Sequence, residues 1–212
     1  GFAHSVPFLA TYFLGFNLEK PPFNDREYRR AVAGAIRKKE ITVALGSGEK
    51  PAYSWIPEGL PGYQPFQSNR EGLDERFQDS VQRIRMKPWD KPIELGFDAS
   101  SRNAMVLEKV QADLQARLGW KIVLKNQEWK TFVKSLYSSP PAIFRHGWST
   151  PTKDPLIFIS PFGTNDPFSF TKTSDAKIDR KISEIRSLPD GPERTAALIA
   201  AEKWIIEEEA LV

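Results

Sequence analysis

Residues 93–125 read IELGFDASSRNAMVLEKVQADLQARLGWKIVLK, and this stretch decides the fold class. Apolar side chains alternate with polar or small ones at its start and again over residues 121–125, which predicts two strands. The helix between them is capped by Ser101 and ends at Gly119. Its expected apolar face consists of Met105, Leu107, Val110, Leu114 and Leu118. Strand, helix and strand in this order predict a βαβ crossover with two parallel strands.

Further elements are predicted on both sides of this unit. Upstream, the patterns predict a strand over residues 10–17, a helix over 25–39 and a polar helix over 73–85. Downstream, they predict a helix over 128–137, a strand over 142–148, a helix that starts at Asp154-Pro155, a helix that carries Ile178, Ile182 and Ile185, and a last helix over 192–209. Asn24 and Glu27 form a capping box for the first helix. The predicted fold class is therefore α/β, with a mixed β-sheet flanked by helices.

Residues 46–70 are rich in Gly, Pro and aromatic residues, Trp55 among them. A stretch of this length without a periodic pattern either covers a surface or forms a binding wall. Its first residues, GSGEK at 46–50, lack the spacing and the Ser or Thr of a phosphate-binding loop. We therefore interpret residues 46–70 as a long loop within a single domain.

Composition excludes several classes of protein. The chain has 212 residues, with 30 Lys or Arg, 27 Asp or Glu and no Cys, so that disulfides, thiolate catalysis and iron–sulfur clusters are excluded. A net charge of +3 is too small to indicate a nucleic-acid partner, and we interpret the basic face of the helix over 25–39 as solvated or salt-bridged. No apolar run approaches the ~18–20 residues that a membrane-spanning helix needs.

Motifs for catalysis or metal binding are missing from the sequence. His4 and His146 are the two histidines, and they are far apart without metal-ligand spacing. The chain has no nucleophile elbow, dinucleotide-binding glycine motif or calcium loop, and no carboxylate pair that indicates acid–base catalysis. We therefore predict that the protein is not an enzyme and that it uses no metal and no cofactor.

Aromatic side chains gather where strands are predicted to end. Trp148 ends the strand over residues 142–148, and Trp129 begins the helix after the preceding strand. Open α/β sheets bind ligands at this edge, where a Trp offers a large rigid contact surface and an Arg such as Arg145 offers a fork for a carboxylate. The sequence therefore predicts a ligand site here. The alternative is that both tryptophans are core residues.

Seven short segments occur in an order that resembles one protein family. They are YFLGFN at 12–17, KPPFND at 20–25, RRAV at 29–32, PAYSWIP at 51–57, QEWKTF at 127–132, RHGW at 145–148 and DP at 154–155. Together they resemble the extracellular solute-binding protein family 5, the periplasmic receptors of ABC importers that include oligopeptide- and dipeptide-binding proteins. The resemblance implies a lobe of type II periplasmic binding protein fold. It identifies residues 1–212 as the C-terminal one of two lobes, and we expect the chain to be a piece of a longer receptor.

The resemblance also implies where a ligand is held. Trp129, Arg145 and Trp148 match pocket-lining positions, with Trp148 in the wall near a peptide amino terminus and Arg145 facing a peptide carboxylate. The full set of expected ligand-binding residues is Trp55, Trp129, Arg145, Gly147, Trp148 and Ser149.

Pro151 departs from the pattern that the resemblance implies. Peptide binders of the family place an Asp three residues after the Trp that matches Trp148, where it holds the peptide ammonium. Pro151 cannot form this ion pair, and the loss of such a contact costs on the order of a few kcal/mol. Asp154 matches the acidic helix start before Pro155 and is therefore an unsuitable substitute. The ligand class stays open between peptides and the oligosaccharides, nickel complexes, haem, opines or modified peptides that other members take up.

The predicted function is that of a periplasmic import receptor, secreted or lipid-anchored. As a monomer, it closes over a peptide or another small polar solute and docks on an ABC permease in the membrane. One alternative is a solute-binding-like sensor domain of a transcriptional regulator. A winged helix-turn-helix upstream of this chain would indicate the regulator, whereas a signal segment there would indicate the receptor. A hydrolase is disfavoured because the sequence shows no nucleophile, base or metal constellation.

Overall fold

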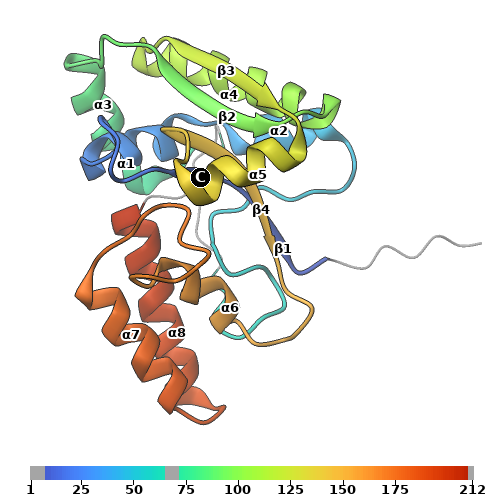
Figure 1. Cartoon of the computed structure of the whole chain (residues 1–212), viewed down its shortest axis with the longest axis vertical. Coiled ribbons are helices and arrows are strands. Elements are labelled where there is room, and N and C mark those ends of the chain that lie inside the picture. The colour runs from blue at the N-terminus through green and yellow to red at the C-terminus, as the bar shows by residue number, and fades with distance from the viewer. Residues whose placement is uncertain (1–7, 65–71, 210–212) are drawn as a thin grey trace, which may run out of the picture.

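The computed structural model describes residues 8–64 and 72–209, and a mixed four-stranded sheet lies at its centre (Figure 1). The strands are β1 (Ala10–Phe16), β2 (Ile93–Asp98), β3 (Ile122–Gln127) and β4 (Ile143–Ser149), in the spatial order β1-β4-β2-β3. β2 runs parallel to β3 and β4, whereas β1 runs antiparallel to β4. The predicted α/β class, the mixed sheet and the parallel βαβ unit are all confirmed.

Helices surround this sheet. They are α1 (Arg26–Ala35), α2 (Lys38–Leu45), α3 (Gln78–Met86), α4 (Ser101–Leu118), α5 (Trp129–Ser138), α6 (Leu156–Ile159), α7 (Ala176–Ser187) and α8 (Pro192–Trp204). Two 3₁₀ turns, η1 (Glu75–Phe77) and η2 (Ser160–Phe162), precede α3 and follow α6, and a π-helical turn, η3 (Ile205–Glu209), extends α8. Figure 1 shows α6, α7 and α8 grouped at the end of the molecule opposite β3 and α4.

The cap and the apolar face of α4 differ slightly from the prediction. Ser100, not Ser101, is the N-cap, because its backbone is extended and its Oγ accepts a hydrogen bond from the Asn103 N–H at 3.1 Å. Gly119 ends the helix in the left-handed conformation, as predicted. Met105 is exposed, and the neighbouring Val106 is buried instead, because α4 packs against α1 as well as against the sheet.

The predicted helix over 25–39 is two helices. Its N-cap is Asp25 rather than Asn24, since the Asp25 carboxylate accepts from the Glu27 N–H at 2.9 Å. The chain then becomes extended at Ile36, where the Arg37 N–H donates to Asp113 Oδ2 at 2.9 Å and the Arg37 guanidinium pairs with the same carboxylate. Because of this contact with α4, α1 ends one turn before the predicted end of the helix, and the local sequence pattern does not indicate it.

The basic face of α1 holds the chain's last described turn. Arg26 forms an ion pair with the Glu208 carboxylate at 3.1 Å, and Arg29 donates to the Glu208 carbonyl. Arg30 Nε donates to the Glu207 carbonyl at 2.7 Å. These arginines thus satisfy carbonyls at a helix end, where a positive charge also interacts favourably with the helix dipole. The interpretation of this part of the face as salt-bridged is confirmed.

Replacement of Arg29 by lysine is expected to lower the free energy of unfolding by about 2 kcal/mol. Arg29 is buried, and its guanidinium spans the carbonyls of Phe23, at 2.6 Å, and Glu208, whereas a single ammonium cannot reach both. Urea denaturation measures the change. Arg26→Lys is the matched control, with an expected loss below about 0.5 kcal/mol because its ion pair is half exposed. Equal losses in the two variants would contradict this role for Arg29.

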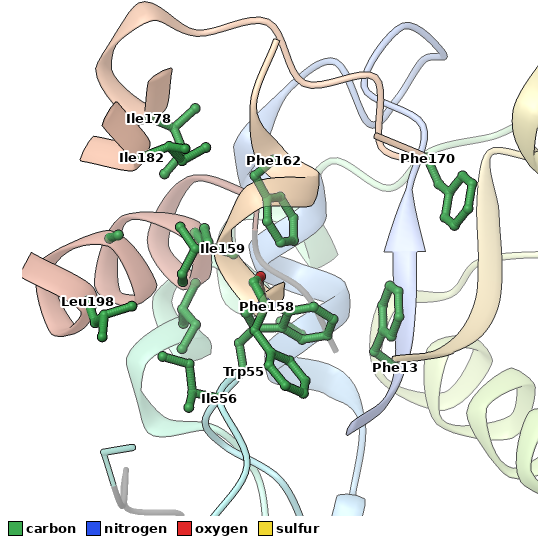
Figure 2. Packing of buried hydrophobic residues seen from close by; sticks show 14 of the residues in the cluster. Phe13, Trp55, Ile56, Phe158, Ile159, Phe162, Phe170, Ile178, Ile182 and Leu198 are labelled. Atoms are coloured by element: carbon green, nitrogen blue, oxygen red, sulfur yellow. Dashed lines mark hydrogen bonds between the residues drawn. The ribbon is translucent and has the colours of Figure 1, made fainter. Parts of the chain in front are cut away.

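Two apolar cores lie on the two faces of the sheet. One contains α1, α3 and α4 side chains packed on Leu95 and Ile143. The other contains α5 side chains on Phe144 and continues into the α6–α8 group. Figure 2 shows this second core, where Trp55 points toward Phe158 and Phe162 among residues from β1, α7 and α8. The second core therefore joins the sheet to the C-terminal helices, and Trp148 at the end of β4 packs against it.

Candidate functional site

The carboxyl ends of the three parallel strands lie at one edge of the sheet. β2 ends at Asp98, β3 at Gln127 and β4 at Ser149. α5 begins with Trp129 two residues after β3, with the Glu128 carboxylate as its cap. Open α/β sheets bind ligands at such an edge, so that the end of β4 and the start of α5 together form the candidate site.

Six rings form one continuous surface beside this edge, and we call it the aromatic surface. Its members are Trp129, Tyr137, His146, Trp148, Phe168 and Phe170. Trp129 is 51% exposed, Tyr137 47% and Phe168 45%, whereas Phe170 is buried beneath them. Large exposed rings in contact with one another offer a contact surface of considerable area at a low entropy cost.

Three separate segments supply the aromatic surface. α5 carries Trp129, β4 carries His146 and Trp148, and the loop after η2 carries Phe168 and Phe170. The His146 ring centroid lies 6.4 Å from those of both Trp129 and Trp148, and the Phe168 centroid lies 5.6 Å from that of Trp148. The fold therefore brings the two predicted tryptophans to one surface through His146.

Trp148 lies at the boundary between this surface and the core. Its Nε1 donates to the Ile157 carbonyl at 2.8 Å, which fixes the ring. Trp148 is half-buried and Trp129 is half exposed, so that the alternative in which both tryptophans are core residues is wrong. Both have ring surface available for contact with a solute.

Arg145 lies on the other face of β4, because successive side chains of a strand point to opposite faces. Its Nη1 pairs with Asp98 Oδ1 at 2.7 Å, and its guanidinium lies 4.4 Å above the centre of the Tyr12 ring. The Tyr12 hydroxyl donates to Asn103 Oδ1 at 3.2 Å, and burial raises its pKa. A solute carboxylate therefore has to compete with Asp98 for this arginine.

Gly147 and Ser149 share the face of Arg145 and are both exposed. Gly147 lies opposite Tyr12 of β1 and Ser149 opposite Ala10. Both are non-hydrogen-bonded positions of this antiparallel pair, because the Thr150 N–H donates to the Leu9 carbonyl and hydrogen-bonded pairs alternate with non-hydrogen-bonded ones. The backbone N–H and C=O groups of Gly147 and Ser149 therefore point away from β1. The two residues thus lie beside the aromatic surface but not on it.

Trp55 is not brought to this edge as an exposed residue. It is 3% exposed, and its Nε1 donates to the Phe158 carbonyl. Its ring packs edge-on against Phe13, with centroids 4.8 Å apart, and it lines a small cavity together with Trp148. The structure thus places Trp55 behind the candidate site.

Pro151 is exposed, and it lies in the bend between β4 and α6. Asp154, three residues later, accepts from the Leu156 N–H at 3.0 Å and pairs with Arg194 at 2.8 Å. Burial opposes ionisation of the Asp154 carboxyl, but the Leu156 N–H and Arg194 together lower its pKa. Its carboxylate is therefore committed to the start of α6, as the sequence predicts.

Within residues 8–64 and 72–209, no cluster of His, Asp and Glu side chains is suited to hold a metal ion. His4 lies outside the described residues, as do residues 65–70 of the predicted loop. In the same described ranges, none of the helices has the length and apolar character for a membrane crossing.

The unfolding free energy is expected to fall as the pH drops below about 6.5, the ordinary pKa of a histidine, because of His146. Burial among the rings lowers the pKa of His146, and the nearby Arg145 lowers it further, while the Gly147 carbonyl opposes both. The unfolded chain therefore binds a proton at a pH where the folded chain does not. Denaturation of wild type and His146→Gln between pH 7 and pH 5 measures this, and the variant is expected to lose less stability. Identical pH dependence in both proteins would contradict this environment for His146.

Tyr137, Phe168 and Phe170 belong to the aromatic surface but were missed by sequence reasoning. Phe168 and Phe170 lie in a loop without periodicity, and their spacing of two is the single hint that both rings point the same way. Tyr137 lies in the last turn of α5, whose buried residues are Phe132 and Leu136, so that its position in the sequence indicates exposure but does not indicate which residue it contacts.

The fold is that of type II periplasmic binding proteins, as similar solved structures show. The structure of the Escherichia coli murein tripeptide binding protein MppA matches with a TM-score of 0.87 and 24% identity, over 97% of this chain and 42% of that one. Haemophilus influenzae OppA in complex with RPPGFSPFR matches with a TM-score of 0.86 and 20% identity, again over 97% and 42%.

The family model for bacterial extracellular solute-binding proteins, family 5 Middle, matches residues 3–170, and the chain belongs to this family. Among curated relatives, the periplasmic murein peptide-binding protein MppA of Escherichia coli is 26% identical over 98% of this chain. The periplasmic oligopeptide-binding protein OppA of the same organism is 26% identical over 99% of it. The chain spans 40% of the length of each of these relatives.

Proposed function

We propose that this chain is the C-terminal lobe of a periplasmic solute receptor, which closes with a second lobe over a peptide or another small solute. The observation that carries the proposal is the aromatic surface at the carboxyl edge of the sheet, in a chain of solute-binding family 5. The receptor acts as a monomer, without a nucleic-acid partner and without catalysing a reaction. It delivers its solute to an ABC permease in the membrane.

The arrangement of the site supports closure by a hinge. Trp129 and Phe168 are half exposed here, although rings of this size are usually more deeply buried. A second lobe that covers them excludes water from the solute and strengthens each polar contact in the closed site. Closure of this kind is the step that distinguishes a loaded receptor from an empty one for a permease.

The polar groups of this lobe are suited to orient a solute rather than to form an ion pair with its ammonium group. Pro151 provides no carboxylate, and those of Asp98 and Asp154 are paired with arginines. A peptide ammonium, where the solute has one, is therefore held by the second lobe. This lobe holds the solute by ring contact.

Similar relatives named as peptide-binding proteins include MppA and OppA of Escherichia coli, and another relative from the same organism, YgiS, is named as a probable deoxycholate-binding periplasmic protein. Nothing in the described residues favours the regulator alternative.

Thermal unfolding of the complete receptor tests the proposal. Short peptides, oligosaccharides and nickel chelates are added in turn at millimolar concentration. Binding to the folded state alone stabilises by about 2.7 kcal/mol at a ligand concentration 100 times the dissociation constant, so one class is expected to raise the Tm by several degrees. A Tm unchanged by every class would overturn the proposal.

A further inference from the structure

The aromatic surface extends well beyond the two predicted tryptophans. Tyr137 and Phe168 are about as exposed as Trp129, and their ring centroids lie 6.5 Å apart. Tyr137 comes eight residues after Trp129 on α5, which corresponds to about 12 Å along the helix axis. Contiguous exposed apolar surface of this kind marks a binding site. It is long enough to contact more than one group of a solute.

A small apolar cavity adjoins this surface. Its volume is about 20 Å³, and Trp148, Phe168 and Phe170 of the aromatic surface line it together with Phe13 and Trp55 of the core. This volume is sufficient for roughly one group the size of a water molecule. Because its walls are almost entirely rings, a methyl group suits it better than a polar group does.

Three charged side chains near the end of β4 and the aromatic surface already have partners. Arg145 pairs with Asp98 at 2.7 Å, and Asp154 pairs with Arg194 at 2.8 Å. Lys172 comes two residues after Phe170, and its ammonium donates to the Tyr137 carbonyl of α5 at 3.3 Å. A charged solute group that settles here loses its hydration without gaining any of these partners, which is unfavourable.

From these three observations we propose that the solute group facing this lobe is uncharged and apolar, either an aromatic ring or a branched aliphatic chain. The group lies across Trp129, Trp148 and Phe168, with a methyl or ring edge in the adjoining cavity. This selectivity rests on the proposed function, because it concerns the same site. It makes the receptor one for solutes with apolar substituents rather than for solutes of any side-chain chemistry.

The test measures the affinity of the complete receptor for four tripeptides that differ only in the middle residue. The sequences Ala-Phe-Ala, Ala-Leu-Ala, Ala-Glu-Ala and Ala-Lys-Ala are titrated by calorimetry. The phenylalanine and leucine peptides are expected to bind at least tenfold more tightly than the charged ones. Phe168→Ala is expected to reduce this preference to about twofold, since Phe168 contacts the group and lines the cavity. Met86→Ala, which removes an exposed side chain on α3, is the matched control and leaves the preference unchanged.

The outcomes separate this inference from the proposed function. If all four peptides bind equally tightly, the receptor function stands and the apolar selectivity is overturned. If no tripeptide binds, titration with N-phenyl-1-naphthylamine, an uncharged aromatic probe, decides the selectivity alone. Saturable probe fluorescence that Phe168→Ala and Trp129→Ala each reduce at least fivefold supports it, whereas fluorescence that neither variant changes overturns it.

Discussion

Truncation of Trp148 to alanine is expected to raise the dissociation constant of the receptor for its solute about 100-fold, equivalent to about 3 kcal/mol. Trp148 connects several parts of the aromatic surface, because its ring contacts those of His146, Phe168 and Phe170. Its removal takes away a large half-buried ring and also opens the adjoining cavity, which Trp148 lines. The substitution therefore changes both the ring surface that contacts the solute and the wall of the cavity beside it.

Two further variants show whether the effect belongs to the ring. Trp148→Phe keeps an aromatic ring and loses the bond from Nε1 to the Ile157 carbonyl, so that its affinity is expected to fall only about tenfold. Trp129→Ala removes a ring that is 51% exposed and is expected to weaken binding at least tenfold, with little change in stability. Circular dichroism confirms folding before each titration. Wild-type affinity in Trp148→Ala would show that the solute binds elsewhere.

Replacement of Glu202 by alanine is expected to lower the free energy of unfolding by about 4 kcal/mol, since two buried N–H groups lose their acceptor. Glu202 on α8 is fully buried, and its Oε1 accepts from the backbone N–H groups of Trp55, at 2.8 Å, and Ile56, at 2.7 Å. The Ser54 hydroxyl donates to the same oxygen at 2.6 Å. This carboxyl group therefore anchors the loop that places Trp55 behind the candidate site.

Glu202→Gln is the matched control, because its amide oxygen preserves the acceptor. Its expected loss is about 1 kcal/mol. Burial raises the pKa of Glu202 despite its three hydrogen bonds, so that the folded chain holds the proton more tightly than the unfolded chain. Stability from this group therefore falls as the pH rises above about 4.5, and Glu202→Gln removes that decline. Urea denaturation at several pH values measures both effects. An alanine variant as stable as the glutamine variant contradicts the anchoring role.

Local sequence patterns predicted the elements that depend on neighbours in the chain. The βαβ unit, the left-handed Gly119 cap and the three isoleucines of α7 each follow from periodicity within one element. The break between α1 and α2 could not be predicted in this way. It depends on Asp113, a residue 76 positions further along the chain that captures the Arg37 N–H.

The candidate site shows the same division. Trp129 and Trp148 could be placed at the carboxyl edge because strand order along the chain indicates which ends meet there. Arg145 pairs with Asp98, which lies 47 positions away in the sequence. The Trp55 N–H donates to Glu202, which lies 147 positions away, and this contact holds Trp55 in the core. Phe168 and Phe170 join the surface because a loop folds back onto β4, and loops of this kind leave little periodic signal.

Native mass spectrometry of the complete receptor, purified without added ligand from the periplasm of cells that express it, tests whether the aromatic surface holds the solute. We expect one bound solute per protein in the wild type and a largely empty protein in the Trp129→Ala/Trp148→Ala double variant, with both proteins folded. A bound solute retained equally by the double variant, or no bound solute in the wild type under any growth condition, would contradict the claim that this aromatic surface holds the solute.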